Sequence, residues 1–365
     1  MKILLISFSH YPTLQNYLYL LKSNLMKEGY VVCSLGNANV TTTYETQDNS
    51  FFADCMDSAS PSGKNLKLYF SQRRKIKEIV NHINPDAVLF TSKHIWNFLM
   101  MPFLRKKGMR IYHTFHDPVG HAGTHVSKGV IAYNKVISGF LSGIIVHSDI
   151  SLQNTLQYIK PKCKVIKAPL GEKKWLPYTE PTGFKKRLLV FGRISTYKGC
   201  EFIPALADEL VKKCVDCRIV VAGKALDDVA PELMERIGKC DNVELRNEFI
   251  PESELHGYFY AADASLILHK SISQSGVIID AYRHGHPIIC FDIDGISEFV
   301  ADDTALITPK FDLSKMADHI KSMYDSFDHY LKMSRTAYEF GRKVFSEDEM
   351  ASAVLRLLSE QTKGG

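Results

Sequence analysis

Short runs of consecutive hydrophobic residues alternate along this chain with longer segments in which hydrophobic residues recur every three or four positions. A short apolar run bounded by turn residues is typical of a buried strand, and the longer period is typical of an amphipathic helix. Residues 14–27 show the helical period and stop near Gly29, and residues 96–104 show it again. The predicted strands lie at 2–8, 30–36, 86–92, 110–117, 143–148, 164–171, 187–193, 217–224, 243–249, 264–270, 287–291 and 305–310.

Strands that alternate with helices predict parallel sheets with helices on both faces. Both halves of the chain show this alternation, and 365 residues exceed what one hydrophobic core usually fills. We therefore expect an α/β protein of two doubly wound, Rossmann-like domains. The segment 172–186, rich in Pro, Lys and Gly, is the expected linker.

Composition narrows the class of protein. The chain has 45% hydrophobic and 23% charged residues, which is typical of a soluble globular protein, and no apolar run reaches the roughly 18 residues of a membrane span. The first apolar run is too short for a signal peptide. Eight cysteines scattered through predicted strands and helices favour reduced thiols in a cytoplasmic protein.

The charge is distributed unevenly. Residues 1–180 hold 22 Lys and Arg against 11 Asp and Glu, while the remainder holds 23 against 29. A basic half joined to an acidic half suggests that one of them meets an anionic surface or ligand.

The segment 188–199 combines a buried strand, a turn and two cations. The strand ends at Gly192, which can adopt backbone angles that a side chain forbids, and Arg193 and Lys198 follow. Ligands of open parallel sheets bind outside the carboxyl ends of the strands, and these two cations suit a diphosphate there. The alternative is a solvated basic turn.

A second candidate segment begins after the strand at 264–270. Ser275 is a predicted N-cap, and the backbone N–H groups of Ser275, Gly276 and Val277 would form an anion site at the start of a helix. Asp280 lies one turn further along, where a carboxylate can accept ribose hydroxyls. The alternative is an ordinary strand–helix–strand unit.

Together the motifs resemble GT-B glycosyltransferases. The G-R-x(4)-K-G of the second half and its S-G-V-x-x-D-A helix followed by P-I-I-C-F-D-x-x-G-x-x-E are most similar to the retaining family 4 group, which builds bacterial surface polysaccharides and glycolipids. The resemblance implies two domains facing a cleft: an acceptor-side domain over 1–175 and a sugar-nucleotide domain over 176–345. It also implies a C-terminal helix, 346–365, that packs back on the first domain.

The resemblance assigns roles to individual residues. It implies Arg193 and Lys198 on the diphosphate and Asp280 on the ribose of a UDP- or GDP-sugar, with no further cofactor. It further implies Phe249 and Ile250 at the base of the nucleotide, and Gly223 and Lys224 at the same crevice.

Two positions depart from the family pattern. Relatives carry two acidic residues with seven between them; Asp280 matches the second, but Ile272 stands at the first, with Ser273, Gln274 and Ser275 as the nearby polar substitutes. Relatives also have a Gly-Gly turn after the first strand, where this chain has residues 9–12, Ser-His-Tyr-Pro.

The loop 113–125 holds four histidines and an aspartate. Their spacing matches no helical pair of metal ligands, so we expect no metal site. The resemblance instead places His116 and Asp117, with His121 nearby, opposite the donor, where acceptors would stabilise an oxocarbenium-like centre. The alternative is a loop whose side chains form only local hydrogen bonds.

Two basic clusters, 71–79 and 105–110, flank the apolar segment 96–103. They are compatible with a solvated helix face or with an anionic membrane surface that presents a lipid-linked acceptor. Nucleic acid is not expected, because the clusters lack interleaved aromatic residues and any known binding motif.

The sequence thus predicts a glycosyltransferase that moves a sugar, with retention, from a nucleotide diphosphosugar to a saccharide or lipid-linked acceptor. A catalytically silent GT-B subunit is the alternative, since the first acidic residue is absent. A sugar-nucleotide epimerase of related fold is a third hypothesis.

Overall fold

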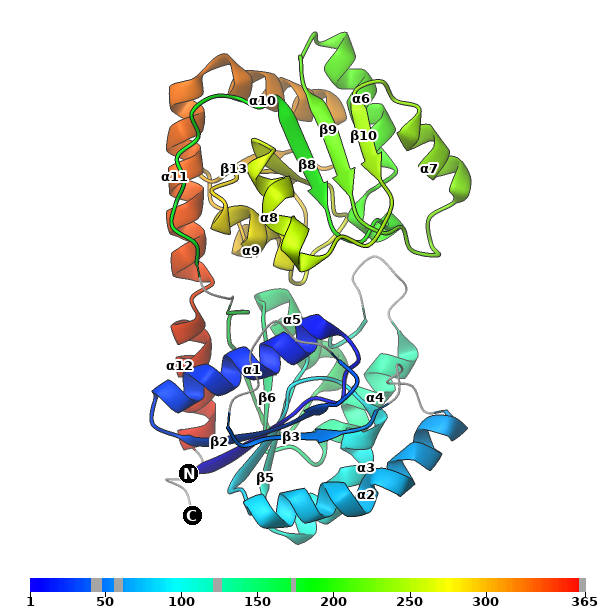
Figure 1. The fold of residues 1–365 in the computed structure, drawn as a ribbon, viewed down its shortest axis with the longest axis vertical. Helices are drawn as coiled ribbons and strands as arrows, with labels where there is room; N and C mark the ends of the chain where they lie inside the picture. The colour runs from blue at the N-terminus through cyan, green and yellow to red at the C-terminus, as the bar shows by residue number, and fades with distance from the viewer. Residues whose placement is uncertain (41–47, 56–61, 121–126, 172–174, 361–365) are drawn as a thin grey trace. The chain divides into compact units, whose positions relative to one another are not determined.

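The computed structural model describes residues 1–40, 48–55, 62–120, 127–171 and 175–360. They form two compact units (Figure 1). Unit 1 comprises the described residues of Met1–Gly120, Val126–Lys173 and Ser346–Gly365, and unit 2 those of Lys174–Phe345. Part of the expected linker, residues 172–174, lies outside the described residues.

Unit 1 contains a seven-stranded sheet in which every neighbouring pair is parallel. The strand order β3-β2-β1-β4-β5-β6-β7 runs outward in both directions from the first strand. The strands are β1 (Lys2–Ile6), β2 (Val31–Asn37), β3 (Ser50–Ala53), β4 (Ala87–Phe90), β5 (Arg110–Thr114), β6 (Gly143–Val146) and β7 (Lys164–Lys167).

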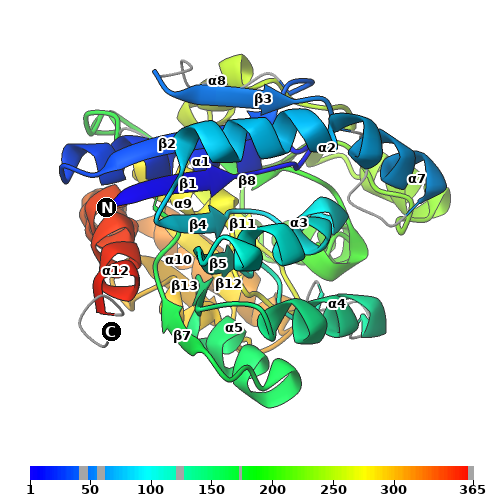
Figure 2. The same ribbon diagram turned by 90° about the horizontal axis from the view of Figure 1, so that it is seen from below.

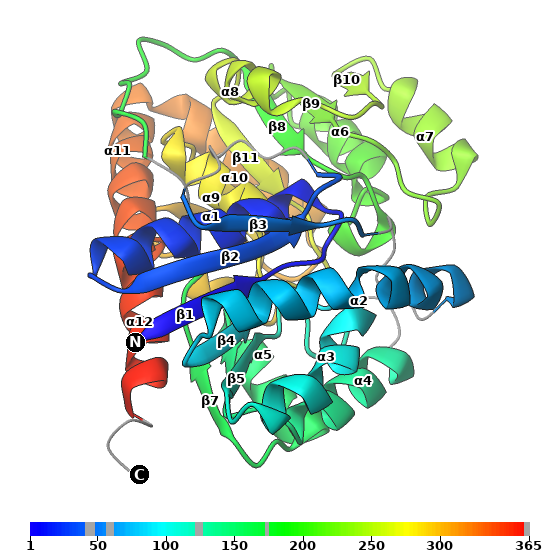
Figure 3. The same ribbon diagram turned by 60° about the horizontal axis from the view of Figure 1, so that its bottom comes forward.

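The helices of unit 1 cover both faces of this sheet (Figures 2 and 3). Successive side chains of a strand point to opposite faces. Ile3 and Leu5 pack with α1 (Pro12–Lys27) and α12 (Glu347–Glu360), while Leu4 and Ile6 pack with α2 (Gly63–Ile83) and α3 (Ile95–Lys106). The helices before the linker are α1 (Pro12–Lys27), α2 (Gly63–Ile83), α3 (Ile95–Lys106), α4 (Lys128–Ser138), α5 (Asp149–Asn154) and the π-helical turn η1 (Thr155–Ile159).

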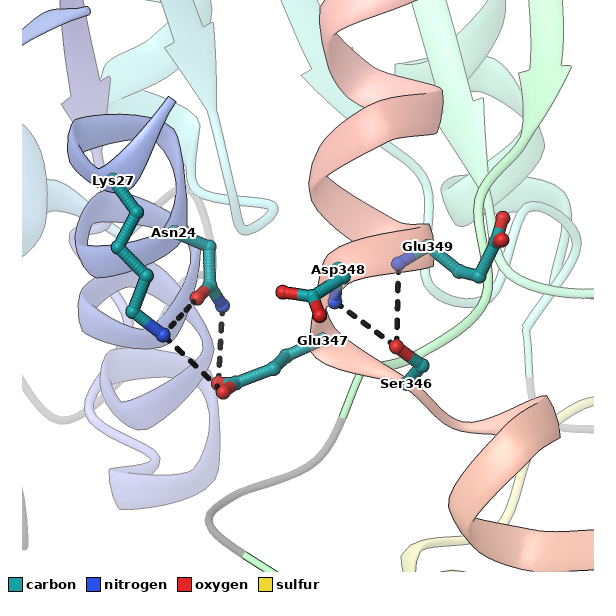
Figure 4. A network of polar contacts seen from close by, with 6 residues as sticks. All are labelled: Asn24, Lys27, Ser346, Glu347, Asp348 and Glu349. Carbon is teal, nitrogen blue, oxygen red and sulfur yellow. Dashed lines mark hydrogen bonds and ion pairs between the residues drawn. The ribbon is translucent and has the colours of Figure 1, made fainter. Parts of the chain in front are cut away.

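The C-terminal helix α12 (Glu347–Glu360) belongs to the core of unit 1. Its side chains Met350, Val354 and Leu357 are buried against the α1 face of the sheet. At its start, the Glu347 carboxylate accepts hydrogen bonds from Asn24 and Lys27 of α1 at 3.2 and 3.3 Å, as Figure 4 shows. The Ser346 hydroxyl caps the helix by accepting from the backbone N–H of Asp348 at 3.2 Å.

Unit 2 repeats the arrangement with six parallel strands in the order β10-β9-β8-β11-β12-β13. The strands are β8 (Arg187–Phe191), β9 (Arg218–Ala222), β10 (Val243–Arg246), β11 (Ala264–Ile267), β12 (Ile288–Phe291) and β13 (Ala305–Thr308). The helices are η2 (Thr196–Lys198), α6 (Phe202–Lys212), α7 (Pro231–Gly238), α8 (Glu252–Tyr260), α9 (Gly276–Arg283), η3 (Ile296–Glu298), α10 (Leu313–Asp325) and α11 (Phe327–Val344).

The two sheets confirm the predicted pair of doubly wound α/β domains. In each, the direction of winding reverses beside the first strand, between β1 and β4 in unit 1 and between β8 and β11 in unit 2. A crevice forms at such a reversal because the connections leave its two strands toward opposite faces. Among the described residues, no helix has the length and apolar character that crossing a membrane requires.

Replacing Leu357 with alanine is expected to lower the free energy of unfolding of unit 1 by about 2–5 kcal/mol, because it removes a fully buried side chain. Urea unfolding would be followed by the fluorescence of Trp96 in a Trp175→Phe background, since these are the two tryptophans of the chain. The control is Arg356→Ala at the exposed neighbouring position, which should change stability by at most about 0.5 kcal/mol. Equal losses in the two variants would contradict the packing role of α12.

Candidate functional site

Two glycines bring the ends of β8 and β9 into close contact in unit 2. Gly192 follows β8 with φ +90°, and its N–H donates to the Ala222 carbonyl at 2.9 Å. A Cβ atom on Gly223 would lie 1.9 Å from the Gly192 carbonyl oxygen, so no larger residue fits there. The backbones of the two segments therefore pack directly against each other at the edge of the crevice.

Lys198 and the first turn of α9 meet at Gly192. A Cβ atom built on this glycine would lie 3.5 Å from both Lys198 Nζ and Val277 Cγ2. Burial, and then the charge of Arg193, lower the pKa of Lys198 to about 8. Arg193 itself is exposed. The structure thus brings Arg193, Lys198 and the start of α9 to the winding reversal of the sheet, as the sequence predicts.

The turn that carries Lys198 is fixed by backbone contacts to neighbouring strands. A Cβ atom on Gly199 would lie 1.9 Å from the Leu268 carbonyl oxygen, just beyond β11. The Lys270 N–H donates to the Tyr197 carbonyl at 3.1 Å, and the Thr196 hydroxyl donates to Asp228 at 2.6 Å. These contacts fix the backbone of the turn from which the Lys198 side chain extends.

The start of α9 differs from the prediction in one respect. Ser275 occupies the predicted N-cap position, but its side chain makes no capping hydrogen bond. Ser275 is buried, Gly276 is exposed and Val277 is intermediate. Because the helix is not capped by its own Ser275 side chain, its first N–H groups remain suited to an external anion.

Asp280 lies in the same helix and is paired with Arg283 at 2.9 Å, where both side chains are largely buried. The ion pair holds the carboxylate in one orientation. Ile272, at the position of the first family acid, is 2% exposed and belongs to the core.

The residues expected at the base lie on the β9–β10 side of the crevice. Lys224 follows Gly223 and is exposed, and its carbonyl accepts from the Ile194 N–H at 2.9 Å. The Asn247 side chain accepts from the Ala225 N–H at 2.8 Å, which fixes the segment before Phe249 and Ile250. Phe249 is 77% exposed, so its ring is available for stacking.

Sequence reasoning missed two buried polar residues beside Lys198. Ser195 and His269 line a small cavity together with Lys198 and Arg193. Among the described residues, neither Ser195 Oγ nor His269 Nδ1 has a hydrogen-bond partner. Burial, and then the charge of Lys198, lower the pKa of His269 to about 3, so its ring is neutral. The only sequence signal was position: Ser195 follows the predicted strand 187–193, and His269 lies near the carboxyl end of the predicted strand 264–270.

His116 and Asp117 follow β5 in unit 1, and both are partly exposed. His116 Nε2 donates to the Thr91 carbonyl at 2.8 Å, which ties the loop to the end of β4. Burial lowers the pKa of His116, and the Asp117 carboxylate opposes that shift. His121, expected nearby, lies outside the described residues.

The Gln15 amide makes two hydrogen bonds that hold the loop after β1. Gln15 Nε2 donates to the carbonyls of Ser7 and Ser9 at 3.0 and 2.9 Å. This contact fixes the segment 9–12 that stands where relatives have two glycines. Within the described part of the chain, no group of three or more His, Cys, Asp or Glu side chains is arranged to hold a metal ion.

The two basic clusters lie on neighbouring helices. Tyr69 of α2 donates to the Leu99 carbonyl of α3 at 3.2 Å, and Lys77 Nζ lies 5.2 Å from the Phe103 ring. Residues 73–75 and 105–107 are exposed. The apolar residues between the clusters contribute less surface than expected, because the structure buries Trp96, Met100 and Met101.

Comparisons with known proteins agree with this geometry. Residues 185–326 match the family described as Glycosyl transferases group 1. An alpha-D-kanosaminyltransferase of Streptomyces kanamyceticus is 26% identical over 159 residues, which cover 41% of this chain and only 39% of that relative.

Solved structures resemble the whole chain. Sucrose-phosphate synthase of Thermosynechococcus elongatus superposes with a TM-score of 0.76 at 15% identity, over 100% of both chains. Anabaena HepE, solved in complex with UDP-glucose, gives a TM-score of 0.73 at 16% identity, over 99% of this chain and 100% of that one. These similarities agree with the predicted resemblance: the chain has the GT-B fold, and its residues 185–326 match the glycosyl transferases group 1 family.

Proposed function

We propose that the protein transfers a sugar, with retention, from a nucleotide diphosphosugar to a saccharide or lipid-linked acceptor, in the synthesis of a surface polysaccharide or glycolipid. The observation that carries the proposal is the meeting of Lys198, Arg193 and the first turn of α9 at Gly192. Two cations and a helix N-terminus at one point favour a doubly charged anion. A diphosphate leaving group is such an anion.

The donor would extend from this point in two directions. Asp280 would accept hydrogen bonds from the ribose hydroxyls, and Phe249 and Ile250 would contact the base. UDP-sugars are the first donors to test, because the similar HepE structure contains UDP-glucose. GDP-sugars are the second, since nothing in the side chains at 247–251 excludes a purine.

We assign the chemical step to His116 and Asp117. As the sugar–phosphate bond breaks, positive charge develops on the sugar and negative charge on the leaving diphosphate. The Asp117 carboxylate would oppose the first charge, and Arg193 and Lys198 would stabilise the second.

The second candidate function is a catalytically silent subunit that binds nucleotide. Its support is Ile272, an apolar core residue at the position of a family acid. Donor hydrolysis distinguishes the two functions: a transferase slowly releases nucleoside diphosphate from its donor, whereas a silent subunit returns the donor unchanged.

Arg193→Ala and Lys198→Ala are each expected to weaken UDP binding about 10- to 150-fold, because each removes a charge-assisted contact of about 1.5–3 kcal/mol. Isothermal titration calorimetry measures the loss. Lys321→Ala, which removes an exposed cation elsewhere in unit 2, is the matched control and should bind as the parent does.

The pH dependence separates a charge effect from a structural one. Since the pKa of Lys198 is lowered to about 8, the free protein loses this cation above that pH, and UDP affinity should fall between pH 7 and 9. Lys198→Arg keeps its charge and should flatten the fall. Parent affinity in both alanine variants would mean that the phosphate site lies elsewhere.

Asp117→Asn is expected to lower turnover at saturating donor at least about tenfold while donor affinity changes less than about twofold. The variant keeps the size of the side chain but removes a charge that acts mainly in the transition state. Initial rates and calorimetry measure the two quantities. Lost donor affinity with intact turnover would make Asp117 a binding residue, and full activity would make the loop structural.

We also propose that the exposed basic residues of α2 and α3 hold the protein at the cytoplasmic face of an anionic membrane. Arg105, Lys106 and Lys107 are exposed, and Phe70, which is 59% exposed beside Arg73, adds an apolar contact. This surface also accounts for the basic charge of the first half.

The protein is expected to sediment with vesicles that contain anionic lipid, and to be released as salt rises. The triple variant Arg105→Ala, Lys106→Ala, Lys107→Ala should bind roughly 100-fold more weakly, at about 1 kcal/mol for each cation. The triple Lys321→Ala, Lys332→Ala, Arg342→Ala removes the same charge from unit 2 and serves as control. Equal binding to neutral and anionic vesicles would overturn the proposal.

A further inference from the structure

Three aromatic rings from three elements pack together at the carboxyl edge of the unit 1 sheet. Tyr17 of α1 lies 5.2 Å from the His116 ring and 5.3 Å from the His147 ring, edge-on to both at 80° and 82°. The two imidazole rings lie 4.9 Å apart. Tyr17 and His147 are 4% and 5% exposed, so His116 is the member of the cluster that reaches the surface.

The hydrogen bonds of the two imidazoles define where their protons are. A carbonyl oxygen only accepts, so His116 carries its proton on Nε2, 2.8 Å from the Thr91 oxygen. A neutral ring with its proton on Nε2 has its lone pair on Nδ1. His147 shows the opposite arrangement, because its Nδ1 lies 2.9 Å from the Ala168 oxygen and Nε2 is then the acceptor.

Packing holds the His116 ring in the orientation in which Nε2 faces the Thr91 oxygen. A half-turn of the ring about Cβ–Cγ would bring Cε1 to the Thr91 oxygen in place of Nε2 and lose the hydrogen bond, and the Tyr17 and His147 rings pack against the ring in its present orientation. The charges around it are those of Asp117, which favours protonation, and of His147 and His113, which oppose it when charged. Burial lowers the pKa of both His113 and His147 to about 3, so both neighbours are neutral near pH 7.

We propose that Tyr17 and His147 are positioning residues that lock His116 in the Nε2–H tautomer and thereby present Nδ1 as a fixed hydrogen-bond acceptor. A neutral acceptor nitrogen recognises a hydroxyl group and not a phosphate. The ligand group at His116 is therefore a hydroxyl of the sugar substrate or of the acceptor. This inference rests on the proposed function for the ligand, but the state of the ring is independent of it.

The test follows His116 by long-range proton–nitrogen NMR correlations in protein labelled at its histidines, with the signal assigned by its loss in His116→Gln. The parent should show the Nε2–H tautomer at pH 8, and its titration midpoint should lie below the ordinary value of about 6.5. Tyr17→Leu and His147→Leu remove one wall each while keeping apolar bulk. Each should give a mixture of both tautomers and move the titration midpoint toward the ordinary value of about 6.5.

Tyr17→Phe is the matched control, since it keeps the ring and removes only the hydroxyl, and its His116 signal should equal the parent's. Near-ultraviolet circular dichroism checks that each variant is folded. If one leucine variant fails to fold, the other carries the test. A parent-like His116 signal in a folded leucine variant would overturn the positioning role.

Activity provides a second, separate readout. In the folded leucine variants, turnover at saturating substrates should fall about 10- to 100-fold with little change in donor affinity, as expected when a catalytic group is misplaced. If His116→Gln transfers sugar at the parent rate, the catalytic role of His116 fails while the NMR result still decides the positioning. If His116→Gln is inactive and the tautomer never changes, the positioning fails and the proposed function stands.

Discussion

Every strand in both sheets is parallel to its neighbours, and this constraint governs the rest of the fold. A parallel sheet must be covered on both faces, because its strands are hydrophobic on both sides. Ile3 and Leu5 point to one face of unit 1 and Leu4 and Ile6 to the other. On the first of these faces α1 alone does not complete the core, so the chain returns after Phe345 and supplies α12. The C-terminal helix is thus part of the N-terminal unit for a physical reason.

The same constraint creates the candidate site. The chain adds strands outward from β8 to both edges of the sheet, and this leaves a crevice between β8 and β11. The glycines at 192, 199 and 223 allow backbone segments to approach one another closely there. The crevice holds two neighbouring cations, and no carboxylate pairs with Arg193 or Lys198 among the described residues. Their repulsion and the burial of Lys198 destabilise the empty site. A bound diphosphate would offset both the repulsion between the two cations and the burial of the Lys198 charge. The arrangement therefore favours anion binding and does not stabilise the free protein.

Features that depend on residues close together in the sequence were predictable, and features that depend on contacts between distant residues were not. Strands, helices and the positions of Arg193, Lys198 and Asp280 follow from patterns within about a dozen residues. Trp96 lies in the apolar segment between the two basic clusters, and only the packing of α2 with α3 shows that it is buried. The Ser275 cap was predicted from residue type, whereas the side chain's direction depends on burial. Tyr17 and His147 were missed because 130 positions separate residues that are ring neighbours.

The buried isoleucine at position 272 bears on the choice between an active enzyme and a silent subunit. An acid that had simply been lost would leave an ordinary apolar environment, yet two polar atoms nearby, Ser271 Oγ and Gln274 Oε1, are buried without a hydrogen-bond partner among the described residues. Each such atom costs about 1–3 kcal/mol in the free protein. A side chain that only fills space in a core is usually apolar, because a buried polar atom without a hydrogen bond destabilises the fold. Polar groups buried at the candidate site are instead expected where a bound molecule with hydroxyl groups satisfies them, which is in keeping with the proposed sugar donor.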